Sequence, residues 1–85
     1  MVDRYIVYGR TTCFFCKSAL SLLEAQDLEH VFMDLTGDDQ ALTEARIFYD
    51  HPTVPIILKN NQNDGLTRLI GGYTELAEHL GATDF

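Results

Sequence analysis

The chain has 85 residues, of which 46% are hydrophobic and 22% are charged. This composition excludes the disordered, low-hydrophobicity class of chains, so we expect a single globular domain over residues 1–85. Thirteen acidic and six basic residues give a net charge of −7, which disfavours binding to nucleic acid and to anionic membrane surfaces.

The first part of the chain predicts a strand, a helix and a second strand. Residues 5–8 are β-branched and aromatic and are closed by Gly9, which is typical of a short buried strand. Apolar residues then recur at spacings of three and four, at Cys16, Ala19, Leu20 and Leu23. A helix should therefore begin at or just after Cys13. Residues 31–33 predict the second strand, which completes a parallel crossover unit.

A second helix is expected over residues 38–49. Thr36, followed three residues later by Asp39, resembles a capping box, and apolar residues continue at helical spacing after it. Pro52 excludes a longer helix. Residues 54–58 then predict a third strand, with Pro55 close to its start.

The end of the chain predicts a hairpin and a last helix. Residues 59–65 have turn composition, and because this loop is short, the strand at 66–70 should pair antiparallel with its predecessor. Tyr73 or Thr74 opens a helix that stops at Gly81. The element order is βαβαββα, which is an α/β pattern.

The chain has two cysteines, Cys13 and Cys16, too few for a disulfide scaffold but typical of a redox or metal pair. At a helix N-terminus, unpaired N–H groups and the helix dipole favour the thiolate form of Cys13, and Arg10 adds positive charge nearby. Cys16 lies one turn further on the same side, within reach of a mixed disulfide formed at Cys13. The spacing therefore indicates an attacking cysteine and a resolving one.

Two other interpretations of the cysteine pair stay open. The pair could be structurally inert, or it could bind zinc together with two of the three histidines, which are His30, His51 and His79. Neither a His-x3-His spacing nor a second cysteine pair supports zinc. Phe14 and Phe15 cannot both face the core, so at least one should be exposed beside the thiols, either to receive a disulfide-bearing partner or to pack beneath a loop.

Three segments together resemble the glutaredoxin family. They are residues 8–16, which contain Cys-Phe-Phe-Cys, then Thr53-Val54-Pro55, and finally Gly71-Gly72-Tyr73-Thr74. They occur in the family's order, and the resemblance spans nearly the whole chain. It implies a thioredoxin-like fold, with a four-stranded mixed sheet and three helices.

The resemblance also implies an activity, namely glutathione-dependent reduction of protein disulfides and glutathione mixed disulfides. Cys13 would be the nucleophile, Cys16 the resolving cysteine and glutathione the co-substrate. Pro55 would be a cis-proline that turns the Val54 backbone toward the cleft, where an extended thiol peptide can pair with it. The glutathione-binding residues implied are Arg10, Phe15, Val54, Pro55, Gly72, Tyr73 and Thr74.

The chain departs from the family's commonest active site, Cys-Pro-Tyr-Cys, at Phe14 and Phe15. Phe14 stands where that motif has proline, so the chain has a backbone N–H at the helix start that proline would lack. Some family members without the proline hold a [2Fe–2S] cluster between two subunits, which is a minor alternative here. A second alternative is that the chain is a glutaredoxin-like electron donor, for example to ribonucleotide reductase, and is itself reduced by thioredoxin reductase.

We expect a cytoplasmic monomer without an obligatory metal. Its partners would be glutathione and disulfide-containing client proteins, among which ribonucleotide reductase is a candidate. The segment Met1 to Tyr8 lacks the apolar run of a secretory signal, and no apolar stretch approaches the ~20 residues that span a bilayer.

Overall fold

The computed structural model describes residues 3–81 of the chain. Its four strands form one sheet in the order β2-β1-β3-β4. The strands are β1 (Asp3–Gly9), β2 (His30–Asp34), β3 (Ile56–Asn61) and β4 (Thr67–Gly71). β1 runs parallel to β2 and antiparallel to β3, and β3 runs antiparallel to β4. The mixed sheet, the hairpin and the βαβαββα order confirm the α/β fold predicted from the sequence.

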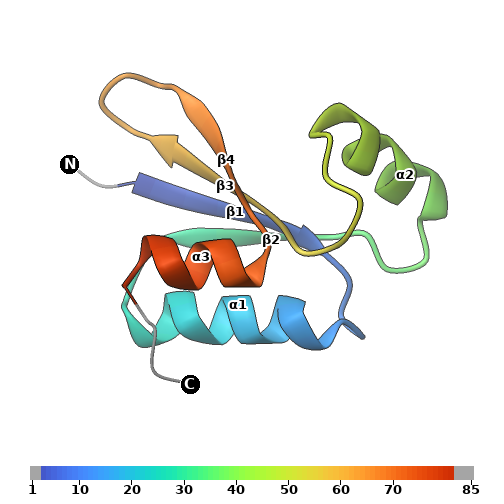
Figure 1. The fold of residues 1–85 in the computed structure, drawn as a ribbon, viewed down its shortest axis with the longest axis horizontal. Helices are drawn as coiled ribbons and strands as arrows, with labels where there is room; N and C mark the ends of the chain where they lie inside the picture. The colour runs from blue at the N-terminus through green and yellow to red at the C-terminus, as the bar shows by residue number, and fades with distance from the viewer. Residues whose placement is uncertain (1–2, 82–85) are drawn as a thin grey trace.

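Two of the three helices cover one face of the sheet, as Figure 1 shows. The helices are α1 (Phe14–Ala25), α2 (Asp39–Phe48) and α3 (Tyr73–His79). α1 packs against β1 and α3, and α3 packs against β4. α2 lies instead at the end of the sheet where β1 and β2 finish. This is also the end at which α1 begins, so three connecting segments meet there.

The core lies between the sheet and the α1–α3 layer. Strand side chains alternate between faces, so Tyr5 and Val7 of β1 point the same way, toward Ala19 and Leu23 of α1. Leu23 is fully buried, and burying a leucine side chain stabilises the fold by about 1.5–3 kcal/mol. The predicted apolar spacing of the first helix is therefore its core-facing side.

The predicted capping box at Thr36 and Asp39 is wrong. The N-cap of α2 is Asp38, whose carboxylate accepts the Ala41 N–H at 3.0 Å. The Thr36 hydroxyl accepts the Thr11 N–H at 2.9 Å instead. Thr36 lies beside the loop that follows β1. Its hydroxyl therefore binds Thr11, which is distant in sequence, and does not cap the helix that follows it.

The third strand also differs from the prediction of residues 54–58. It begins at Ile56, immediately after the Val54–Pro55 peptide, and continues to Asn61. The reason is its pairing with β1, whose register extends from Tyr8 opposite Ile56 to Asp3 opposite Asn61. Pairing with β1 thus extends the strand over residues 59–61, which were expected to belong to the turn. Within residues 3–81, no helix is long and apolar enough to span a membrane.

Candidate active site

Cys13 occupies the N-cap of α1, as the sequence predicted. The turn after β1 is closed by the Cys13 N–H, which donates to the Arg10 carbonyl at 3.2 Å. The Cys13 sulfur accepts the backbone N–H of Cys16 at 3.2 Å. The sulfur thus takes the place that a Ser or Thr oxygen usually has at a helix N-cap. Cys13 is partly exposed and can meet a substrate.

Cys16 has the opposite environment, with only 1% of its surface exposed. Burial, and then the hydrogen bond with the Cys13 side chain, raise the pKa of Cys16 to about 12. A hydrogen bond with the Arg10 backbone and the Arg10 charge oppose this shift in part. Cys16 therefore stays a protonated thiol near neutral pH while Cys13 is the accessible sulfur.

Gly9 provides the space that the Cys16 sulfur fills. A β-carbon at Gly9 would lie 2.3 Å from Cys16 Sγ, which is closer than two such atoms can approach. The sequence indicated only that Gly9 closes a strand. Its second role depends on how α1 packs beneath β1, and no local signal reveals that packing.

The segment before β3 forms the opposite side of the site. The Val54–Pro55 peptide bond is cis, as the resemblance implied. The Cys13 sulfur lies 4.0 Å from the Val54 carbonyl oxygen. The fold thus places the backbone of Val54 directly beside a thiol that lies 41 residues away in sequence.

A cavity of about 250 Å³ opens beside this pair. Six of the expected binding residues line it, namely Phe15, Val54, Pro55, Gly72, Tyr73 and Thr74. Arg10 is not among the lining residues and lies in the turn before Cys13. His51 and Glu75 also line the cavity, and no motif in the sequence predicted this position for either of them. The Glu75 carboxylate accepts the Gly72 N–H at 2.8 Å, so the start of α3 carries its own negative charge.

Comparisons with known proteins agree with this geometry. The family model for Glutaredoxin matches residues 5–62, which is more than half of the chain. The chain belongs to the glutaredoxin family. A comparison with curated proteins found no match. The family and the fold support a thiol-disulfide oxidoreductase.

Solved structures show the same fold at low sequence identity. A mutant of the thioredoxin-like protein BC3987 is 20% identical, with a TM-score of 0.64 over 93% of this chain and 96% of that chain. A structure from work on the thiol resolving mechanism of a yeast mitochondrial 1-Cys peroxiredoxin via glutathione and thioredoxin systems is 22% identical. Its TM-score is 0.53, over 99% of this chain and 79% of that chain. These likenesses show that this glutaredoxin has a thioredoxin-like fold.

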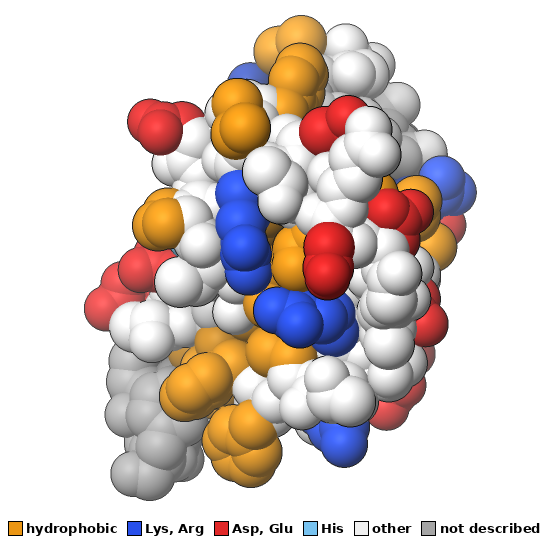
Figure 2. Space-filling view, turned by 90° about the vertical axis from the view of Figure 1, so that its right-hand side faces the viewer, with side chains coloured by type: hydrophobic (Ala, Val, Ile, Leu, Met, Phe, Trp, Pro, Cys, Tyr) orange, Lys and Arg blue, Asp and Glu red, His pale blue; other side chains and the backbone are white. Residues whose placement is uncertain are grey.

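Aromatic side chains surround the thiols of this glutaredoxin. Phe14 is 72% exposed and Phe15 is 54% exposed, so both residues face solvent, where the sequence required only one. The Phe15 ring lies 5.4 Å from Phe14 and 6.0 Å from Tyr73. Figure 2 shows the face at this end of the molecule, where hydrophobic side chains lie among Lys, Arg, Asp and Glu side chains. The exposed rings of Phe14 and Phe15 thus make the surface beside the thiols apolar.

Metal ligands do not gather at this site. Within the described part of the chain, no three His, Cys, Asp or Glu side chains lie in a group that could hold a metal ion. The three histidines proposed for the zinc alternative are placed on separate elements: His30 on β2, His79 on α3 and His51 in the segment after α2.

The raised pKa of Cys16 predicts a loss of stability at alkaline pH. The folded protein holds the Cys16 proton more tightly than the unfolded chain, where a cysteine titrates near ~8.5. The contribution of Cys16 to the free energy of unfolding should be fully present below that value. It should be lost, by up to about 1.4 kcal/mol per pH unit, as pH rises toward the folded pKa of about 12. Urea unfolding under reducing conditions measures this slope.

Cys16→Ala is the matched control for this slope. Tyr5 and Tyr49, whose pKa values are also raised by burial, titrate in both proteins, so the difference between the two curves isolates Cys16. Parallel curves would contradict the assignment.

Proposed function

We propose that this chain uses glutathione to reduce glutathione mixed disulfides and protein disulfides through Cys13 and Cys16. The observation that carries the proposal is the position of the Cys13 sulfur. It accepts a backbone N–H at the start of α1 and lies 4.0 Å from the Val54 carbonyl, beside a cavity lined by the family's glutathione-binding positions. An accessible thiol at a helix N-terminus, a backbone to align its substrate and an adjoining cavity are the parts that this reaction needs.

Reduction of a mixed disulfide uses Cys13 alone. The Cys13 thiolate attacks the glutathione sulfur, the new S–S bond forms, and the client leaves as a thiolate that takes a proton from water. A second glutathione thiolate then attacks the glutathione sulfur held on Cys13. Oxidised glutathione leaves and the Cys13 thiolate is restored, so the net reaction consumes one free glutathione and converts the client's mixed disulfide into a client thiol and oxidised glutathione.

Reduction of a protein disulfide needs both cysteines. Cys13 attacks one client sulfur and releases the other as a thiolate. Cys16 then loses its proton and attacks the Cys13 sulfur, which frees the second client thiol and leaves a Cys13–Cys16 disulfide. Two glutathione molecules return this disulfide to the dithiol. Because Cys16 is buried against Gly9, we propose that its sulfur meets only the sulfur already bound at Cys13.

The binding roles carried over from the family complete the proposal. The Val54 backbone would pair with the cysteinyl residue of glutathione, Phe15 would cover it, and Arg10 would attract the glycyl carboxylate. Gly72, Tyr73 and Thr74 would receive the γ-glutamyl end. Such a protein requires a reducing compartment with glutathione, in keeping with the expected cytoplasmic location.

A comparison of glutathione with thioredoxin reductase as the electron source tests the proposal. With a glutathionylated peptide, NADPH oxidation should require glutathione and glutathione reductase, and thioredoxin reductase should not replace them. Turnover with thioredoxin reductase alone would support the rival electron-donor function and contradict the glutathione-dependent one. Protein with Cys13→Ser serves as the blank for the uncatalysed rate.

A further inference from the structure

We infer that His51 is a positioning residue for the thiol ligand, because its ring holds the backbone next to Val54. His51 Nδ1 lies 2.7 Å from the Thr53 carbonyl oxygen. A carbonyl oxygen can only accept, so Nδ1 must carry the hydrogen and donate it. This bond fixes the carbonyl of the residue that precedes Val54. The inference rests on the proposed function, in which the Val54 backbone pairs with glutathione.

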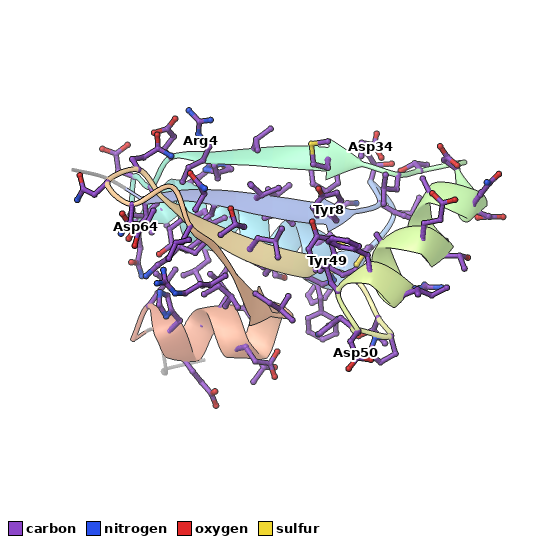
Figure 3. The ribbon with its side chains drawn as sticks, turned by 90° about the horizontal axis from the view of Figure 1, so that it is seen from above. Arg4, Tyr8, Asp34, Tyr49, Asp50 and Asp64 are labelled. Carbon is purple, nitrogen blue, oxygen red and sulfur yellow. The ribbon has the colours of Figure 1, made fainter. Side chains whose placement is uncertain are left out.

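The backbone of His51 is anchored at the end of α2. Its N–H donates to the Arg46 carbonyl at 2.9 Å, and Asp50 before it has a φ of +51°, the conformation that commonly closes a helix. Tyr49 packs its ring 5.6 Å from Tyr8 of β1, with the two ring planes tilted by 44°, and Figure 3 shows these two side chains close together. The ring of His51 therefore extends from a fixed backbone.

The ring also faces the second wall of the cavity. A β-carbon at Gly72 would lie 3.7 Å from His51 Cε1, which is ordinary van der Waals contact. His51 thus lies between the Val54 segment and the turn that leads into α3, and both segments line the same cavity. Removing the ring would release the Thr53 carbonyl. We expect the ligand's backbone partner to become less ordered while Cys13, held separately by α1, stays in place.

Four variants separate this positioning role from a general loss of stability. In His51→Asn the side-chain amide nitrogen stands at the δ position and can donate as Nδ1 does, whereas in His51→Gln it stands one atom further out. His51→Leu removes the donor. The matched control is His30→Leu, because His30 Nδ1 lies 2.7 Å from the Leu28 carbonyl at the start of β2 and His30 does not line the cavity.

The expected result is a change in substrate binding without a change in thiol chemistry. His51→Leu and His51→Gln should raise KM for a glutathionylated peptide about 3- to 10-fold, the range for loss of one hydrogen bond, with kcat little changed. His51→Asn and His30→Leu should stay within about twofold of wild type. The rate of Cys13 alkylation by iodoacetamide should be equal in all five proteins.

Several outcomes would overturn the inference. A wild-type KM in both His51→Leu and His51→Gln would contradict it, as would an equal rise in His30→Leu. If His51→Leu fails to fold, the comparison of His51→Asn with His51→Gln tests the inference. Equal KM values for these two variants would contradict the positioning role of His51. Nitrogen-15 NMR of the wild-type ring gives a direct check, because a hydrogen on Nε2 rather than Nδ1 refutes the bond. Absence of glutathione turnover in wild type itself would instead refute the proposed function.

Discussion

Replacing Cys13 with Ser should reduce both reductase activities to the uncatalysed rate, whereas Cys16→Ser should separate them. Of the two cysteines, Cys13 is the partly exposed one and Cys16 is buried, so Cys13 makes the first bond in both reactions. Cys16→Ser should retain most of the activity on a glutathionylated peptide, because glutathione itself resolves that intermediate. Its activity on a disulfide-bonded protein should fall roughly tenfold or more, because the intermediate at Cys13 then waits for an external thiol.

Both substrates are measured in parallel with glutathione and glutathione reductase. Because Cys16 is 1% exposed, Ser places a hydroxyl in an apolar site, and thermal melting must show that the variant is folded at the assay temperature. Cys16→Ala, which buries no hydroxyl, serves as the second variant. Equal losses on the two substrates would refute the resolving role of Cys16, and full activity in Cys13→Ser would reverse the two assignments.

Gly9→Ala should destabilise the protein by about 1–3 kcal/mol, as overpacking of a core does. The added methyl would lie 2.3 Å from Cys16 Sγ, so the sulfur or the strand must move. The change should also lower protein-disulfide reduction more than reduction of the glutathionylated peptide, because it displaces the resolving sulfur and leaves Cys13 in place. Cys16→Ala removes the overlapping atom and should restore most of the lost stability.

A double-mutant cycle in urea measures this coupling. The destabilisation by Gly9→Ala should fall below about 1 kcal/mol in the Cys16→Ala background, since the nearest remaining contacts are Cys16 Cβ at 3.2 Å and Phe32 Cε1 at 3.4 Å. Gly37→Ala is the control, because Gly37 has a φ of +79° and nothing within 4 Å. Its effect is one of backbone conformation and should be the same with or without the Cys16 sulfur. Equal effects of Gly9→Ala in the two backgrounds would show that Gly9 does not make room for Cys16.

The element order and the start of the catalytic helix followed from the sequence because both depend on neighbours in the chain. Apolar spacing and turn residues act within a few positions, and they placed Cys13 at the first turn of α1 and paired β3 with β4. The same local logic failed at Thr36, whose hydroxyl binds Thr11 across 25 positions. A side chain with two competing partners cannot be assigned from its near neighbours alone.

The site itself depended more strongly on tertiary structure. The sequence determined which sulfur begins a helix and which glycines, prolines and aromatics accompany it. Only the fold brought Cys13 to the Val54 carbonyl across 41 positions, set the Cys16 sulfur against Gly9, and placed the His51 ring between Thr53 and Gly72. These contacts depend on the order of strands in the sheet and on how α1 packs beneath it, since both are decided by the total burial of the core rather than by any one local pattern.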